Sequence, residues 1–166
     1  DRFDKKHINN LNKNIAIIFR KYNMKPNIRK INEIKKFCKL SGRKFFLSNN
    51  IKLALKLNLD GVYLPSFNKS IKINIYSKKT NFLVLGSAHN LKEIKIKEKQ
   101  NVDAIFLSSL FKKKKTYLGL KRFKNLKSKT LLKIIALGGI NKNNIKELRL
   151  LNVYGFAAIS FFNNTK

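Results

Sequence analysis

Short, almost continuously apolar runs recur along this chain, about 20 to 30 residues apart, and they limit the folds that it can adopt. Runs without a polar residue at every second position are typical of strands that are buried on both faces of a parallel sheet. We therefore predict strands at residues 14–20, 44–48, 60–65, 81–87, 103–109, 133–139 and 154–160.

Amphipathic helical patterns lie between these runs. Asn90 begins one of them, and Glu93 follows three residues later, as in a capping box. Gly42 ends another at a position that suits the residue after a helix C-cap. His7 lies in a short polar helix near the start of the chain. Besides this short helix, the predicted helices span residues 27–42, which ends at Gly42, residues 50–58, residues 90–100, which begins at Asn90, and residues 141–152.

The alternation of strands and helices predicts an α/β fold built from βα units. Seven units fit a TIM-type (β/α)8 barrel, lacking its first strand and most of its last helix, better than they fit a flat sheet. The chain has 166 residues, whereas a closed barrel normally takes roughly 200 or more. We expect one domain over residues 1–166, with a flavodoxin-like open sheet as the structural alternative.

Two of the chain's 7 glycines stand together in "IIALGGIN", residues 134–141. In a (β/α)8 barrel, a phosphate is often held by the loops after strands seven and eight. Gly138 and Gly139 follow strand seven by our count, and Ile159-Ser160 ends strand eight. Glycine lets backbone N–H groups approach an anion closely, and Asn141 would cap a helix aimed at it. A tight turn without a ligand is the alternative.

The formal net charge of +30, from 38 basic and 8 acidic residues, is extreme. Such a charge can mark a nucleic-acid or membrane partner. Lys, Asn and Ile are all abundant, however, and AT-rich codons encode all three. No aromatic interleaving or RNA-binding motif accompanies the lysine run at residues 112–115, so we expect no nucleic-acid partner.

Cysteine usage and hydropathy favour a cytoplasmic protein. Cys38 is the only cysteine, which excludes an intrachain disulfide and a cysteine-based metal site. Its helical surroundings indicate a small core residue. No apolar run reaches the roughly 18 residues of a membrane span, so we expect no membrane partner. The sequence leaves open whether the chain forms a homodimer.

Eight landmarks in order resemble the thiamine phosphate synthase family, which includes the TenI-like thiazole tautomerases. The chain resembles a divergent member of this family and is similar to the members of alphaproteobacterial type. The matching stretches are "DRF" (1–3), "IIFRKY" (17–22), "LDGVYLPS" (59–66), "LGSAHN" (85–90), "DAIFLSSLF" (103–111), "LGLKRF" (118–123), "ALGGI" (136–140) and "GFAAISFF" (155–162).

The resemblance implies two alternative reactions. The synthase joins hydroxymethylpyrimidine pyrophosphate to thiazole phosphate: pyrophosphate leaves, and the thiazole nitrogen captures the pyrimidine methyl cation. Mg²⁺ and basic groups stabilise the leaving pyrophosphate. The tautomerase moves a proton on the thiazole ring instead. A degenerate ligand-binding barrel without catalysis is a third alternative.

The same resemblance assigns residues to these substrates. Gly138, Gly139, Ile159 and Ser160 correspond to the thiazole-phosphate site. The remaining matches are Arg20 near the pyrophosphate, Ser87 at the pyrimidine or pyrophosphate, His89 as the acid–base group of the tautomerases, and Lys115 with Thr116 in the loop where the synthase has T-x-T-K.

The chain departs from the family at the metal site. Ser48-Asn49 replaces an N-D pair of the family. Asn68 replaces a second aspartate. Ser66, two residues before Asn68, corresponds to a substrate-binding position. Both carboxylates that bind Mg²⁺ in the family are thus amides here. An amide supplies an oxygen without charge, so we expect Mg²⁺ binding to be weakened.

Overall fold

The computed structural model describes residues 3–22, 25–76 and 79–163, which form two compact units. Unit 1 comprises the chain up to Leu64 together with Tyr76–Leu83. Unit 2 comprises Pro65–Ile75 together with the chain from Val84 onward. Asp1 and Arg2 of the "DRF" stretch lie outside the described residues. The single domain over residues 1–166 stays a prediction.

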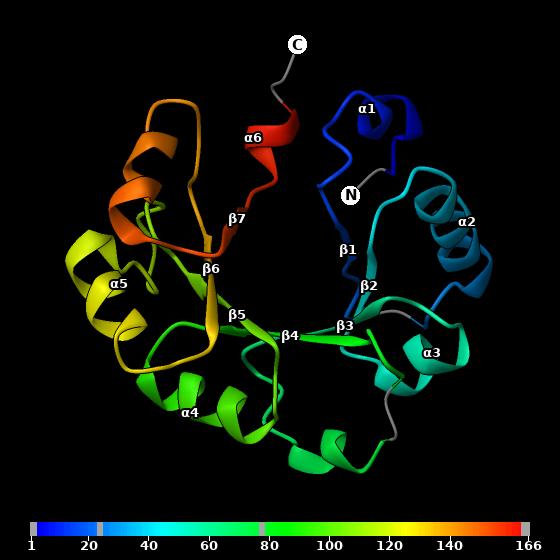
Figure 1. Ribbon diagram of the computed structural model, residues 1–166, viewed down its shortest axis with the longest axis horizontal. Helices are drawn as coiled ribbons and strands as arrows, with labels where there is room; N and C mark the ends of the chain where they lie inside the picture. Colours follow the sequence, from blue (N-terminus) through cyan, green and yellow to red (C-terminus); the bar gives the residue numbers. More distant parts are fainter. Residues whose placement is uncertain (1–2, 23–24, 77–78, 164–166) are drawn as a thin grey trace. The chain divides into compact units, whose positions relative to one another are not determined.

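Unit 1 is a parallel sheet of three strands in sequence order, with helices α2 and α3 on one side of it (Figure 1). Every residue of β2 and β3 is buried, as expected for strands covered on both faces. The elements are α1 (Lys5–Asn9), β1 (Ile17–Phe19), α2 (Ile28–Leu40), β2 (Phe45–Ser48), α3 (Ile51–Lys56) and β3 (Gly61–Leu64).

Unit 2 continues the pattern with parallel strands, again paired in sequence order. In Figure 1, α4 and α5 lie on the same side of these strands. The elements are η1 (Ile71–Ile75), β4 (Leu83–Ala88), α4 (Leu91–Lys99), β5 (Ala104–Ser108), α5 (Gly119–Lys127), β6 (Lys133–Leu137), η2 (Ile145–Leu151), β7 (Gly155–Ala157) and α6 (Ser160–Asn163).

The prediction of a helix over residues 141–152 was partly wrong. Asparagine side chains accept hydrogen bonds from backbone N–H groups in what would be the first turn. Asn144 Oδ1 accepts from the Asn141 N–H at 2.9 Å, and Asn141 Oδ1 accepts from the Asn143 N–H at 2.9 Å. Such local bonds compete with helix formation. The helix therefore starts at Ile145 and has 3-10 geometry, so Asn141 does not cap it.

The end of α2 was predicted correctly, and it carries a buried arginine. Gly42 has a φ of 67° and follows the C-cap Ser41, and the Arg43 N–H donates to the Cys38 carbonyl at 2.8 Å, completing a Schellman motif. The Arg43 guanidinium donates to the carbonyl of Ile8 in α1 and to three carbonyls of the segment after α1, those of Leu11, Asn12 and Ile15. Arg43 thereby joins the N-terminal segment to α2.

Cys38 is buried in α2, as predicted. Burial raises the pKa of its thiol from 9.0 to about 11. None of the helices in the described ranges is long and apolar enough to cross a membrane.

Candidate active site

In unit 1, predicted site residues gather where β1 and β2 end. Phe19 and Leu47 are partners in this parallel pair, so Arg20 and Ser48, the next residues, lie at the same edge. Arg20 is exposed, whereas Ser48 is buried and its Oγ lies 3.5 Å from the Tyr63 carbonyl. Asn49 is exposed, with a φ of 58°, and its N–H donates to the same carbonyl at 2.8 Å.

In unit 2, the segment after β3 carries Ser66 and Asn68, both half-buried. The Asn68 side-chain oxygen accepts from the Ser70 N–H at 3.0 Å and from Gln100 Nε2 at 3.4 Å. Its backbone oxygen accepts from Lys97 Nζ at 2.8 Å and from Gln100 Nε2 at 3.1 Å. Both oxygens of Asn68 are therefore engaged, by Lys97 of α4, by its C-cap residue Gln100 and by Ser70.

Lys97 is completely buried, with an exposed fraction of 0%. Its ammonium donates to the carbonyls of Pro65 and Asn68 and to Gln100 Oε1, at 2.8 to 2.9 Å. Burial lowers the pKa of Lys97 from 10.5 to about 8, and the negative charge of Glu93 opposes this shift. Three neutral acceptors thus partly replace the water that a lysine normally keeps.

The end of β4 holds the two candidate groups predicted there. Ser87 is buried within β4, opposite Phe106 of β5. His89 follows the strand, and its Nδ1 lies 2.9 Å from Glu93 Oε2, which also accepts from the His89 N–H at 2.7 Å. Because a carboxylate only accepts, Nδ1 carries the proton and Nε2 remains for proton transfer.

The start of α4 was predicted as a capping box and differs in one contact. Asn90 Oδ1 accepts from the Glu93 N–H at 2.9 Å, as expected for an N-cap. The Glu93 carboxylate, however, reaches back to His89 rather than to the N-cap residue. The helix start thereby fixes the orientation of the histidine.

The two glycines after β6 accommodate the loop after β5. A Cβ on Gly138 would lie 2.5 Å from Ser109 Oγ, and one on Gly139 would overlap the Lys112 nitrogen. Both residues have positive φ, 106° and 78°. The N–H groups of Phe111 and Lys112 donate to the Gly138 carbonyl at 2.8 and 3.2 Å. Glycine is required here by backbone packing, a reason that the sequence did not reveal.

The lysine-rich loop places Lys115 and Thr116 differently. Residues 112–115 are exposed, so the ammonium of Lys115 can reach solvent. Thr116 is half-buried and its carbonyl accepts from the Ser109 N–H at 2.9 Å. Its Oγ1 is buried without a hydrogen-bond partner among the described residues. A buried hydroxyl in this state is available to a ligand or a water molecule.

A hollow of about 220 Å³ lies between the segments that follow β6 and β7. It is lined by Asn141, Lys142, Asn143, Ser160 and Phe161. The two loops that the sequence assigned to a phosphate therefore do meet, with Ser160 on one side and a lysine on the other. Ile159 is 63% exposed beside Ser160.

The residues present do not fit an ordinary magnesium site. Asn68 Oδ1 already accepts hydrogen bonds from Ser70 and Gln100. Within the described ranges, no group of three or more His, Cys, Asp or Glu side chains could hold a metal. Mg²⁺ prefers carboxylate oxygens in octahedral geometry, and amides supply no charge.

Three residues of this region were not predicted: Lys97, Gln100 and the carboxylate partner of His89. Lys97 lies three residues after buried Ile94 on the inward face of α4. That helical spacing was the one available signal, and the abundance of lysine concealed it.

Replacing Gly139 by alanine should destabilise the protein more than replacing Gly42 does. Both residues have positive φ, but a Cβ on Gly42 would meet nothing within 4 Å. We expect Gly42→Ala to cost about 1 kcal/mol from backbone strain, and Gly139→Ala to cost at least about 2 kcal/mol more. Urea denaturation followed by circular dichroism measures both, and equal losses would contradict the packing argument.

Lys97 should make the free energy of unfolding depend on pH. Between about pH 8 and 10.5 the unfolded chain keeps a proton that the folded chain has released, so this contribution rises with pH. The shift in pKa corresponds to about 3 kcal/mol. Lys97→Met should abolish the rise, as measured by urea denaturation across this range.

Lys92→Met is the matched control, because Lys92 is exposed on the same helix. Cys38 acts in the opposite direction, since its raised pKa keeps a proton on the folded chain that the unfolded chain loses. Its contribution is common to both variants and cancels in their difference. A difference between Lys97→Met and Lys92→Met that is constant with pH would contradict the prediction.

Solved structures show the same fold. A thiamine phosphate pyrophosphorylase from Pyrococcus furiosus superposes with a TM-score of 0.74 at 24% identity, covering 94% of this chain and 77% of the other. A thiamine phosphate pyrophosphorylase from Bacteroides thetaiotaomicron gives 0.64 at 21% identity, covering 91% and 72%. The predicted α/β fold class, a (β/α)8-type barrel, is confirmed.

Sequence relatives agree with the structural ones. A thiamine-phosphate synthase from Methanococcus vannielii is 31% identical over 120 residues, covering 70% of this chain and 58% of the relative. Another, from Pyrococcus horikoshii, is 30% identical over 132 residues, covering 77% and 63%. The chain thus spans about three fifths of the length of these relatives. The family described as thiamine monophosphate synthase matches residues 11–162. This chain therefore belongs to the thiamine monophosphate synthase family.

Proposed function

We propose that this protein is a thiamine phosphate synthase, which condenses hydroxymethylpyrimidine pyrophosphate with thiazole phosphate. The observation that carries the proposal is the hollow between the segments after β6 and β7. Its volume of about 220 Å³, its lysine and its serine hydroxyl suit a phosphate group. Family membership supplies the reaction class.

In the proposed reaction, the bond between the pyrimidine methylene carbon and the pyrophosphate oxygen breaks, and pyrophosphate leaves with the electron pair. The thiazole nitrogen then uses its lone pair to form the new carbon–nitrogen bond. Lys142 and the Ser160 hydroxyl would hold the thiazole phosphate. Lys115, an exposed basic residue of the same unit, would supply positive charge to the departing pyrophosphate.

Dependence on Mg²⁺ is expected to be weak in this protein. The Asn68 oxygen is engaged, and Asn49 offers no charge. Lysine side chains would then provide most of the counter-charge. The proposal also places the protein in the cytoplasm, with small phosphate esters as its partners, and the homodimer is left to measurement of its mass in solution.

Thiamine phosphate formation tests the proposal directly. The purified protein is given both substrates, with Mg²⁺ or with excess EDTA, and the product is oxidised to a fluorescent compound. We expect product in both conditions, with a modest increase at high Mg²⁺. Ser160→Ala should raise KM for thiazole phosphate by about tenfold, the loss of one phosphate contact.

Ser128→Ala, an exposed serine that follows α5, serves as the control and should leave KM unchanged. Absence of product at high enzyme concentration would reject the synthase. Activity that vanishes in EDTA would reject the proposed replacement of the metal by basic side chains.

The His89–Glu93 pair favours a second candidate, a thiazole tautomerase. A histidine whose Nδ1 proton is held by a carboxylate at 2.9 Å can accept and return a proton through Nε2. This chemistry needs no metal. It would use the same hollow for the phosphate of the thiazole.

His89→Ala should then lower tautomerase kcat by at least about 100-fold, the usual contribution of a general acid–base group. Isomerisation of the thiazole carboxylate phosphate, followed by NMR, provides the measurement. Full turnover in this variant would reject the assignment of His89. If neither reaction occurs and thiazole phosphate still binds, the protein is a binding barrel without catalysis.

A further inference from the structure

Lys97 and Gln100 together fix the segment between β3 and η1. Lys97 Nζ donates to the Pro65 carbonyl at 2.9 Å and to the Asn68 carbonyl at 2.8 Å. Gln100 Nε2 donates to the carbonyls of Asn68 and Ser70 at 3.1 and 2.9 Å. A side chain of α4 and that of its C-cap residue thus hold three carbonyls of residues 65–70.

The lysine stem has a dedicated path to these carbonyls. A Cβ on Gly86 would lie 2.8 Å from Lys97 Cδ and 3.1 Å from Cγ. Gly86 is in the middle of β4, where glycine normally weakens a strand. The glycine therefore makes room for the stem to cross the strand that also carries Ser87.

The presence of a charged ammonium group at the buried position 97 indicates a role beyond packing. A fully buried lysine is rare, because desolvating its charge is costly unless several hydrogen bonds compensate. Here a group with three donors meets three acceptors, all neutral, and the bonds are strengthened by its charge. A core position that served packing alone would be filled by an apolar residue without this cost.

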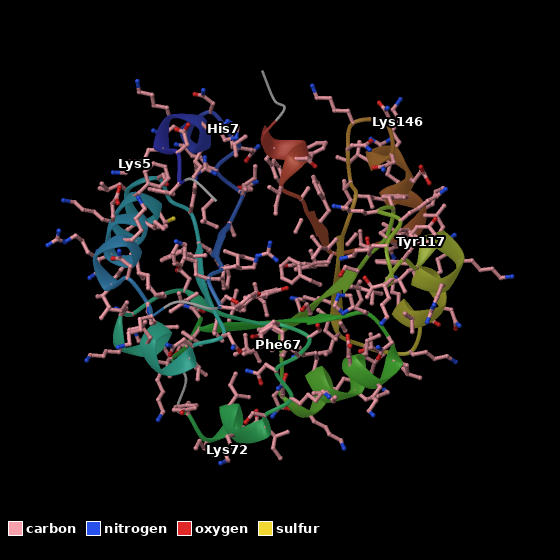
Figure 2. All side chains as sticks on the ribbon, turned by 180° about the vertical axis from the view of Figure 1, so that it is seen from behind. Lys5, His7, Phe67, Lys72, Tyr117 and Lys146 are labelled. Carbon is pink, nitrogen blue, oxygen red and sulfur yellow. The ribbon has the colours of Figure 1, made fainter. Side chains whose placement is uncertain are left out.

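The segment held by Lys97 contains Ser66 and Asn68, which the resemblance to the family assigns to substrate binding. Its backbone has no helix or strand between β3 and η1, so its conformation depends on side-chain contacts. Figure 2 labels Phe67 in this segment and Lys72 just beyond it, and Phe67 is 58% exposed. An exposed segment that is anchored from beneath can present side chains to a ligand.

We propose that Lys97 is a positioning residue, which holds residues 65–70 in the conformation that receives the pyrimidine pyrophosphate. This inference rests on the proposed function. Lys97 does not touch the substrate; it acts through the backbone of Pro65 and Asn68. Its positive charge directly behind Asn68 also favours an anionic ligand on that segment, where the family has a metal-binding aspartate.

Steady-state kinetics of Lys97→Met separate positioning from a purely structural role. Methionine keeps the length of the stem and removes the charge and all three donors. We expect KM for hydroxymethylpyrimidine pyrophosphate to rise by about tenfold or more, with KM for thiazole phosphate unchanged. Lys92→Met is the matched control and should change neither. A structural role alone would reduce the amount of active protein and leave both KM values as they were.

Hydrogen exchange provides a readout that does not need activity. Amides of residues 66–70 should exchange at least about tenfold faster in Lys97→Met than in Lys92→Met, while amides of β5 and β6 keep their rates. Unchanged exchange, or faster exchange without a selective rise in KM, would overturn the inference. If Lys97→Met does not fold, Gln100→Leu, which retains the lysine, should show the same selectivity with a smaller effect.

Failure of the proposed function gives a different result. In that case the wild-type protein makes no thiamine phosphate, and calorimetric titration with inorganic pyrophosphate replaces the kinetic assay. Weaker binding to Lys97→Met than to Lys92→Met, together with faster exchange, would support positioning. Equal binding by the two variants, or no binding by the wild type, would overturn it.

Discussion

The contact between the loop after β5 and the end of β6 fixes the carboxyl edge of unit 2. Amides of Leu110 and Phe111 donate to the carbonyls of Leu137 and Gly138 at 2.9 and 2.8 Å, so two segments distant in sequence share one backbone layer. One segment continues into the lysine run and the other into the hollow that Ser160 lines. Both candidate anion-binding features therefore depend on the same few hydrogen bonds.

The sequence predicted the strands well because burial on both faces leaves a simple signature. β2, β3 and β5 are buried at every position, and each lies within a predicted apolar run. The helical elements were less predictable where local chemistry competes. Asparagine side chains shift the start of η2 to Ile145. Helix α5 was not predicted, and its start has no side-chain N-cap hydrogen bond.

The sequence predicted where the candidate site residues lie better than it predicted why those residue types are present there. Gly138 and Gly139 were found from their place after a strand, but close approach of the β5 loop explains them without any ligand. Lys97 was missed because burial is a tertiary property, and its helical spacing after Ile94 was the one signal among many lysines. The roles of Ser66, Ser87 and Ile159 stay predictions, since position alone assigns them no chemistry.

The packing of Lys97 against Gly86 links two positions that are distant in sequence. The stem occupies the space in which a Cβ on residue 86 would stand, so residue 86 is restricted to glycine while the lysine is present. A relative with a short side chain at the lysine position would remove the two nearest contacts of such a Cβ, leaving Val102 Cγ1 at 3.2 Å, and would lose the anchor for the preceding loop. Residues 86 and 97 should therefore coevolve. In a related sequence, glycine at the position of Gly86 would then indicate that a buried lysine holds the loop between β3 and η1.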